Sequence, residues 1–417
     1  MDAQVALVCL ADARRVAAGR WPGWDFDAHP VAMVLPEGTL LWGHPQPPAD
    51  FRPWTPAFAV PLPGPLHIGP ARTDLANSAR ELGGRTVATA CIASEGGPEW
   101  VQRILLHEAF HAFQLDLRPD SGVPFTRTPD YPEDDAANNA LARAENAALA
   151  AYMEGQLVAA ECAAAVIALR RVRHACIPVD WPGYEDACEW CEGGATLAES
   201  LAFPEARADI IRGLHTCNRG GEGAAIRRFY HTGAAIGLLC SELLPDWQAR
   251  WLVPDTTPFG LLIECVADAG EAGAPEVLRH HGLDGLLAEE ARATRRRRAE
   301  DSRLLAALHP AIEIDTSAVP AHSFMHNPTA LRVLGGGRRL HRGRVRQEGP
   351  GWVFDWREGA GPVLEDLRQG RLVLRLPDGV SHTEGTGPVE LPFLRAHRAE
   401  IRADGQGLRI RLQRVEA

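Results

Sequence analysis

The chain lacks any apolar run long enough to cross a membrane. No stretch of its 417 residues approaches the roughly 20 consecutive apolar residues that a transmembrane helix needs. A short apolar run at residues 5–10 follows Asp2, where a secretory signal carries positive charge, and Arg14 and Arg15 come only after it. We therefore expect a cytoplasmic protein that is not inserted in a membrane.

Positive charge is also in short supply. The sequence has 43 Lys and Arg against 54 Asp and Glu, which gives a net charge of -11. Because phosphate binding needs a basic surface, this balance argues against nucleic acid as a general partner. No phosphate-binding glycine motif and no internal repeat is present either.

Paired cysteines are missing as well. The nine cysteines are odd in number and irregular in spacing, which indicates free thiols in a reducing compartment and not a disulfide framework. Cys188 and Cys191 form one CxxC, but no second CxxC exists. A structural zinc site that adds Cys176, His215 or Cys217 is therefore disfavoured, and the CxxC thiols are expected to pack rather than to bind metal.

The most informative motif that the chain does contain is an HExxH, formed by His107, Glu108 and His111. It lies in residues 98–114, an amphipathic pattern that begins with proline and predicts a helix. Helical residues four apart share a face, so the two imidazoles can hold one Zn²⁺ at about 2.0–2.1 Å, with Glu108 as candidate general base. The alternative is a core helix with two hydrogen-bonded histidines, but burying these polar groups without a metal is costly.

Glu192 is the strongest candidate for a third metal ligand. It is followed by Gly193 and Gly194, and small residues let a second helix approach the first closely. A set of His107, His111 and Glu192 leaves the fourth zinc position open for water, which is the pattern of catalytic and not of structural sites.

On these residues the chain resembles the gluzincin metallopeptidases, which carry HExxH on one helix and a glutamate ligand on a later one. The pattern E-G-x-A-x-x-x-E from Glu192 to Glu199 is similar to the second helix of the aminopeptidase branch. The resemblance implies a zincin-like core, one zinc ion held by His107, His111 and Glu192, and Glu108 as general base. The chain departs from the family in a much longer gap between the two motifs.

Composition changes twice along the chain and predicts an α+β fold. Hydrophobic and charged contents of 46% and 23% are ordinary for a folded protein of two or three domains. We predict an N-terminal helix and β-rich segment at 1–97 that forms part of the catalytic unit, a helical core at 98–309, and an all-β domain at 310–417. The N-terminal strands are expected at residues 31–35, 39–42, 58–62 and 87–92, and further helices at 136–153, 156–173, 227–244 and 288–308.

Several further residues are candidates for supporting roles. Tyr230 or His231 could stabilise the oxyanion of a tetrahedral intermediate, or each could simply be a core or surface side chain. Glu145 is a candidate partner for one of the zinc-binding histidines, or a solvated helix residue. Glu145, Glu189 or an acid of the N-terminal segment could receive the amine of an aminopeptidase substrate, and the loop at 118–135 could overhang the site.

These residues together predict a zinc metallopeptidase. In this reading one zinc ion activates a water that hydrolyses a peptide or protein substrate, with Glu108 as general base. Two alternatives stay open: a non-catalytic binding module with a structural or vestigial metal site, and a zinc hydrolase that acts on a non-peptide acyl substrate. The sequence does not distinguish an endopeptidase from an exopeptidase.

Overall fold

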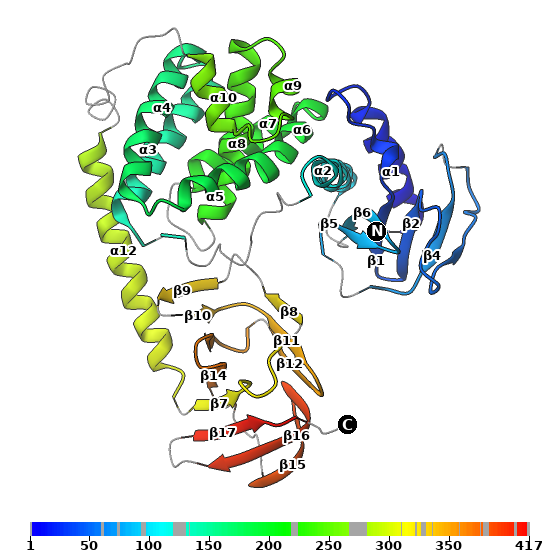
Figure 1. Ribbon diagram of the computed structural model, residues 1–417, viewed down its shortest axis with the longest axis vertical. Coiled ribbons are helices and arrows are strands. Elements are labelled where there is room, and N and C mark those ends of the chain that lie inside the picture. The colour runs from blue at the N-terminus through cyan, green and yellow to red at the C-terminus, as the bar shows by residue number, and fades with distance from the viewer. Residues whose placement is uncertain are drawn as a thin grey trace. The chain divides into compact units, whose positions relative to one another are not determined.

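The protein combines helices with two β-sheets, as predicted for an α+β fold. The computed structural model describes residues 2–59, 62–72, 76–92, 97–119, 131–132, 134–217, 224–266, 282–309, 311–321, 323–326, 331–335, 337–357, 359–375, 377, 383–403 and 407–414. Contacts divide the chain into two compact units (Figure 1). Unit 1 comprises Met1–Pro124, Leu141–Asn218 and Ile226–Leu283, and unit 2 comprises Phe125–Ala140, Arg219–Ala225 and Asp284–Ala417.

The N-terminal part of unit 1 is a six-stranded sheet with the order β3-β4-β2-β1-β6-β5. Central strand β1 pairs antiparallel with β2 and parallel with β6. The predicted strand at 58–62 is wrong for its described residues, because Phe58 and Ala59 are irregular; Pro56, Pro61 and Pro63 provide no N–H for a strand ladder. The strand bounds are β1 Val31–Leu35, β2 Gly38–Trp42, β3 Arg52–Pro53, β4 Leu66–Gly69, β5 Ser78–Leu82 and β6 Arg85–Cys91.

Helix α2 (Pro98–Leu117), which carries the HExxH motif, is the central helix of unit 1. It begins with a proline, whose missing N–H costs nothing in the first turn of a helix. The helix contacts α1 (Ala3–Ala17), strands β5 and β6, and α6 (Gly194–Ala202) (Figure 1). Because neighbours cover it on several sides, the HExxH side chains lie inside the unit.

The remaining helices that lie wholly or mostly in unit 1 follow α2. Helix α3 begins after Asp135, whose Oδ1 accepts hydrogen bonds from the N–H groups of Ala137 and Asn138 at 2.8 and 2.9 Å, so Asp135 caps this helix. None of the described helices is both long and apolar enough to cross a membrane. The bounds are α3 Ala136–Met153, α4 Ala159–Cys176, α5 Trp181–Cys188, α7 Ala206–Thr216, α8 Ala224–Leu243, α9 Trp247–Trp251 and α10 Pro258–Cys265.

A buried cluster of charged side chains lies among α3, α4, α5 and α8 and was not predicted from the sequence. Arg170 donates to Glu145 at 2.8 Å and to Glu189 at 2.6 Å, Arg173 donates to Glu185 at 2.6 Å, and all six side chains of the cluster are buried. The charges balance, because three guanidinium groups face three carboxylates. We call this set the buried arginine cluster; its members are Arg170, Arg173, Arg228, Glu145, Glu185 and Glu189.

Asp186 lies beside this cluster, and its ionisation is expected to make the folding stability depend on pH. Burial, followed by the charge of Glu189, raises the pKa of Asp186 to about 7, and its Oδ1 has no hydrogen-bond partner among the described residues. The folded protein therefore holds a proton between about pH 4 and 7 that the unfolded chain has released, so folding stability falls as the pH rises through this window.

Asp186→Asn is expected to remove this loss of stability. At pH 5, near the lower end of this window, the variant should melt only slightly higher than the natural protein, because most of the stability loss has not yet occurred. At pH 8 the variant should melt a few degrees higher. Melting curves by circular dichroism measure both values, and the exposed Asp255→Asn serves as control. An Asp186→Asn effect that does not change between pH 5 and 8 would contradict the prediction.

Unit 2 contains a long curled sheet with the order β8-β11-β12-β16-β17-β7-β14-β13-β10-β9, with β15 paired to β16. Its side chains alternate: Trp352, Phe354 and Trp356 of β12 point into the core, and the residues between them are more exposed. The bounds are β7 Ala311–Asp315, β8 Ser323–His326, β9 Leu331–Gly335, β10 Arg338–His341, β11 Val345–Gly349, β12 Trp352–Trp356, β13 Val363–Asp366, β14 Arg371–Arg375, β15 Gly385–Leu391, β16 Leu394–Ala403 and β17 Gly407–Leu412.

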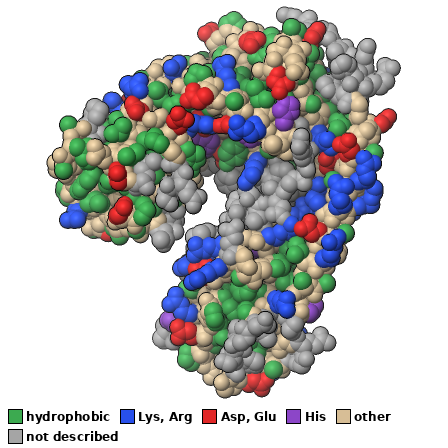
Figure 2. Space-filling model, turned by 180° about the vertical axis from the view of Figure 1, so that it is seen from behind, with side chains coloured by type: hydrophobic (Ala, Val, Ile, Leu, Met, Phe, Trp, Pro, Cys, Tyr) green, Lys and Arg blue, Asp and Glu red, His purple; other side chains and the backbone are tan. Residues whose placement is uncertain are grey.

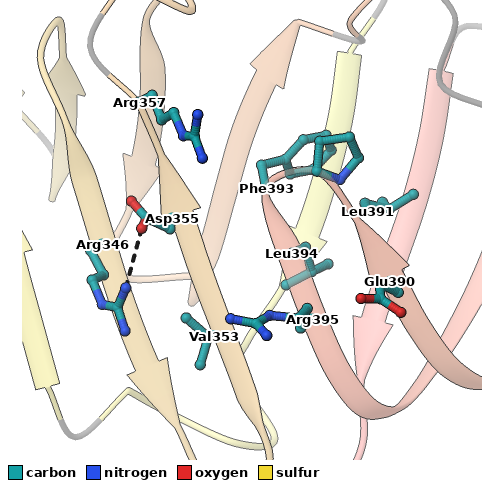
Figure 3. A pocket seen from close by; sticks show the side chains of 10 residues that line it. Arg346, Val353, Asp355, Arg357, Glu390, Leu391, Phe393, Leu394 and Arg395 are labelled. Carbon is teal, nitrogen blue, oxygen red and sulfur yellow. Dashed lines mark hydrogen bonds and ion pairs between the residues drawn. The ribbon is translucent and has the colours of Figure 1, made fainter.

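A cavity of about 390 Å³ lies on this sheet (Figure 3). The cavity is lined by three arginines: Arg346 of β11, Arg395 of β16, and Arg357, which follows β12. Asp355 also lines it and pairs with Arg346 at 3.2 Å. None of the candidate site residues that we predicted from the sequence lines this cavity.

Helix α12 (Leu283–Ala306) also belongs to unit 2 and carries a run of four arginines, Arg295–298. Blue basic side chains gather along this helix in Figure 2. Three of the four arginines are exposed, while Arg297 is half-buried and lies 3.5 Å from Asp134. The run is therefore largely a solvated face, as its interspersed acids indicate.

Candidate metal centre

The three predicted metal ligands meet at one place in unit 1. His107 and His111 lie on α2, and Glu192 lies on a π-helical turn, Glu189–Gly193, between α5 and α6. The Nε2 atoms of the two histidines are 3.1 Å apart, and Oε2 of Glu192 lies 3.2 Å from His111 Nε2 and 3.6 Å from His107 Nε2. All three side chains are buried. Tertiary structure thus brings together residues that are 81 positions apart.

The spacing of these three atoms fits a tetrahedral zinc ion. Ligands at about 2.0–2.1 Å from zinc lie about 3.3 to 3.4 Å from one another, which matches the mean of the three observed distances. The point equidistant from the three atoms is about 1.9 Å from each, so an ion slightly outside their plane reaches all three at a normal bond length. No fourth His, Cys, Asp or Glu joins this group among the described residues.

A cation explains this arrangement better than protons do. One proton can bridge only two of the three converging electron pairs, and two protonated imidazoles 3.1 Å apart would repel each other. Burial alone would lower the pKa of His107, yet hydrogen bonds to Glu192 and Glu199 raise it to about 9. Burial likewise opposes ionisation of Glu192, but the neighbouring histidines hold its pKa below its ordinary value. The site therefore attracts positive charge strongly.

The outward-facing nitrogen of His107 is held by a carboxylate. Its Nδ1 lies 3.5 Å from Oε2 of Glu199, the last residue of the E-G-x-A-x-x-x-E pattern. Arg103, on the same helix as His107, binds Glu199 and also bonds to Asp209 of α7 at 2.6 Å. A carboxylate on the far side of a histidine orients the ring and increases its basicity as a ligand.

Gln114 performs the corresponding task for His111 and also ties α2 to the turn that carries Glu192. Its Oε1 accepts a hydrogen bond from Nδ1 of His111 at 2.8 Å, which leaves Nε2 free to face the metal position. Its amide N–H groups donate to the carbonyls of Trp190 and Cys191 at 2.8 and 3.0 Å. Sequence reasoning missed Gln114, although its place three residues after His111 on one helical face was a usable signal.

The two glycines after Glu192 allow close packing, as predicted, but toward two different helices. A Cβ on Gly194 would lie 2.8 Å from Nε2 of Gln114, so this glycine admits α2. A Cβ on Gly193 would lie 2.5 Å from the Cα of Gly233, so this glycine admits the backbone of α8. Any side chain at Gly193 would therefore push the turn away from α8.

Glu108 is buried beside the ligands and its carboxylate is incompletely bonded. The side chain is 4% exposed, and Oε2 has no hydrogen-bond partner among the described residues. Burial, the largest effect, raises the pKa of Glu108 even though the two histidines act in the opposite direction. A buried acceptor whose Oε2 makes no hydrogen bond to the described residues is suited to general-base chemistry.

The structure separates the two candidates for oxyanion stabilisation. The Tyr230 ring stacks on the His107 ring with centroids 6.0 Å apart and planes 6° apart. Burial, followed by the charge of Glu192 and a hydrogen bond to its carboxylate, raises the pKa of Tyr230, so the hydroxyl keeps its proton. His231 points to α7 instead, where its ring packs on Gly213, and burial lowers its pKa to about 4. Of these two candidates, Tyr230 is the one with a described contact to the ligand set.

All three roles predicted for Glu145, as histidine partner, solvated residue or amine-binding acid, are wrong, and so is the amine-binding role of Glu189. These carboxylates are 1% exposed and are bonded to Arg170 within the buried arginine cluster, so neither is solvated or free to bind a substrate amine. The sequence around Glu145 and Glu189 did not reveal this burial, because their arginine partner lies far away along the chain. Glu199 takes the position outside the ligand shell that was considered for Glu145.

The remaining candidates do not build a second metal site among the described residues. Cys188 is buried, and the Sγ of Cys191 lies 3.6 Å from Nδ1 of His111, so both thiols pack beside the centre. Within the described residues, no group of three potential metal ligands includes Cys176, His215 or Cys217. Of the predicted overhanging loop at 118–135, residues 120–130 and 133 lie outside the described residues.

Comparisons of the chain with protein-family models, with curated proteins and with solved structures find no match. The likeness to gluzincins therefore rests on the residues of the site alone.

Proposed function

We propose that this protein is a zinc-dependent hydrolase of the gluzincin type, with a zincin-like core and a peptide bond as substrate. The observation that carries the proposal is the convergence of His107, His111 and Glu192 on one point, beside a carboxylate oxygen of Glu108 that has no hydrogen-bond partner among the described residues. Two imidazoles and one carboxylate are a common ligand set of catalytic zinc, and they leave a coordination position for water or substrate.

The side chains of the site have distinct tasks in such a reaction. Zinc, when bound, would polarise the substrate carbonyl and make a water molecule more acidic. Glu108 would take the proton from the attacking water and pass it to the leaving amine. Tyr230 would donate its hydroxyl proton in a hydrogen bond to the oxyanion, since its raised pKa keeps it protonated. Glu199 and Gln114 would hold the imidazoles in place.

A purely structural metal site fits these observations less well. Structural zinc sites are closed by four protein ligands, whereas three donors meet here among the described residues. A structural site also has no need for a buried carboxylate whose oxygen lacks a hydrogen-bond partner in the described part of the chain, because such burial costs desolvation energy.

Elemental analysis together with a peptide digestion assay tests the proposal. The purified protein should contain about one equivalent of zinc per chain, and it should cleave bonds in a mixture of peptides. A chelator should stop cleavage, and added zinc should restore it. Full zinc content without cleavage of peptides or of acyl esters would favour the binding module, and cleavage of esters alone would favour another acyl substrate.

Tyr230→Phe is expected to slow hydrolysis without loss of metal. Removal of one oxyanion donor typically lowers kcat by about 10²- to 10³-fold, and the phenyl ring can still stack on His107. Steady-state kinetics and zinc content measure the two effects. Tyr152→Phe removes a hydroxyl that bonds to Glu242 elsewhere in the unit and is the matched control. Unchanged kcat in Tyr230→Phe would remove this residue from the mechanism.

A further inference from the structure

The π-helical turn that carries Glu192 needs support from outside the helix. Residues Glu189–Gly193 interrupt an otherwise α-helical segment formed by α5 and α6. Such single turns are rare in proteins, are frequently found at functional sites, and change the direction of the side chains that they carry. The direction of Glu192 therefore depends on whatever keeps this turn in its π-helical form.

The first residue of the turn, Glu189, is held by three strong hydrogen bonds. Arg170 of α4 donates from Nη1 to one carboxylate oxygen at 2.6 Å and from Nη2 to the other at 2.8 Å. Thr232 of α8 donates its hydroxyl to the second oxygen at 2.5 Å. The planar guanidinium matches both carboxylate oxygens at once, so it fixes the orientation of Glu189 as well as its position.

Arg170 itself is anchored in the rest of the buried arginine cluster. It also bonds to Glu145 of α3 at 2.8 Å and lies over the ring of Phe259 of α10, with its central carbon 5.1 Å from the ring centroid. Burial alone would raise the pKa of Glu145, but Arg170 and Arg173 hold it below its ordinary value, so the pair is ionised. The turn is thus connected to α3, α4 and α10 through one side chain.

We propose that the buried arginine cluster, acting through the Arg170–Glu189 pair, positions Glu192 and thereby sets the affinity of the site for its metal. Glu189 and Glu192 are three residues apart in the same turn, so a shift of Glu189 moves the third ligand. Arg170 is a positioning residue, because none of its described contacts is with His107, His111 or Glu192. The inference deepens the proposed function and rests on its metal site.

The energetics of buried ion pairs support a positioning role. The free-energy cost of removing two charges from water largely cancels the energy of their attraction. Well-packed apolar side chains often stabilise a fold equally well. The three arginines and three glutamates are therefore expected to contribute no more to the free energy of unfolding than an apolar core of the same volume would. They provide directional bonds that apolar packing cannot, and two of these bonds end on the turn beside Glu192.

Metal affinity in matched arginine variants tests the proposal. Arg170→Lys keeps the charge but cannot bond both oxygens of Glu189 in one plane. Arg173→Lys makes the same change one turn further along α4, where the described partners are Glu145 and Glu185, outside the π-helical turn. Zinc dissociation constants are measured by competition with a chromophoric chelator, the visible spectrum of the cobalt-substituted protein reports ligand geometry, and melting curves of the metal-free proteins report folding.

We expect Arg170→Lys to weaken zinc binding at least about 10-fold and to change the cobalt spectrum, as for other groups that hold metal ligands in place. Arg173→Lys should lower the melting temperature by a similar amount but leave zinc affinity within about 2-fold. Equal zinc affinity in both variants, or equal loss in both, would overturn the proposal. If the natural protein binds no metal at all, the proposed function itself fails.

A second pair of variants decides the question if the lysine variants do not fold. Thr232→Val keeps the shape of the side chain but removes its hydrogen bond to Glu189, and Thr232→Ser keeps the hydroxyl. We expect Thr232→Val to weaken zinc binding several-fold and Thr232→Ser to retain it. Zinc affinity that is the same in Thr232→Val and Thr232→Ser would count against positioning through Glu189.

Discussion

Glu108→Gln is expected to lower the rate of hydrolysis by about 10²- to 10⁴-fold while the protein keeps its metal. The amide has the shape of the carboxylate but cannot take a proton from water. The change breaks no hydrogen bond at Oε2, which has no partner among the described residues. It also leaves His107, His111 and Glu192 in place. Steady-state kinetics on a cleaved peptide and zinc content per chain measure the two expectations.

Glu99→Gln is the control for this variant, because Glu99 lies on the same helix but is exposed. It should keep both activity and zinc. If Glu108→Gln instead hydrolysed the peptide at the natural rate, proton transfer would have to be assigned to another group. If it lost zinc, Glu108 would be part of the metal shell and not the general base.

Glu192→Ala is expected to have the largest effect on metal binding. Loss of an outer partner of a ligand typically costs 10- to 100-fold in affinity, and loss of a ligand itself should cost more than about 100-fold. Zinc at 100 times its dissociation constant stabilises a fold by about 2.7 kcal/mol, so the natural protein should melt at a higher temperature when zinc is present. This increase should disappear in Glu192→Ala, together with hydrolysis.

The change in melting temperature on adding zinc is the decisive quantity for this variant, because removing a buried carboxylate next to two histidines also changes the stability of the metal-free protein. Glu205→Ala, an exposed glutamate that precedes α7, is the matched control and should melt and bind zinc as the natural protein does. Zinc affinity that survives in Glu192→Ala would show that the third ligand lies elsewhere.

Much of the secondary structure near the site was predictable from short sequence patterns. The apolar strands at 31–35 and 87–92, the proline that begins the HExxH helix and the cap at Asp135 all reflect interactions within a few residues. The predicted strand at 58–62 failed in its described part, because an apolar run does not form a strand where prolines remove ladder donors.

The outer partners of the site were less accessible. Gln114 could have been found from its spacing to His111, since helical periodicity places residues three apart on one face. The bonds of Glu145 and Glu189 to Arg170 could not, because they join helices that are 19 to 25 residues apart along the chain. Nothing local distinguishes such glutamates from solvated ones.

The sequence by itself determined which groups could bind a metal and which could move a proton. The spacing of His107 and His111 forces both imidazoles onto one helical face wherever that helix lies, because the α-helix repeats every 3.6 residues. Only the tertiary structure decided that Glu192 completes the set and that Tyr230, not its neighbour His231, contacts it. Those contacts depend on how helices pack over long sequence separations, and adjacent residues on one helix point in directions about 100° apart.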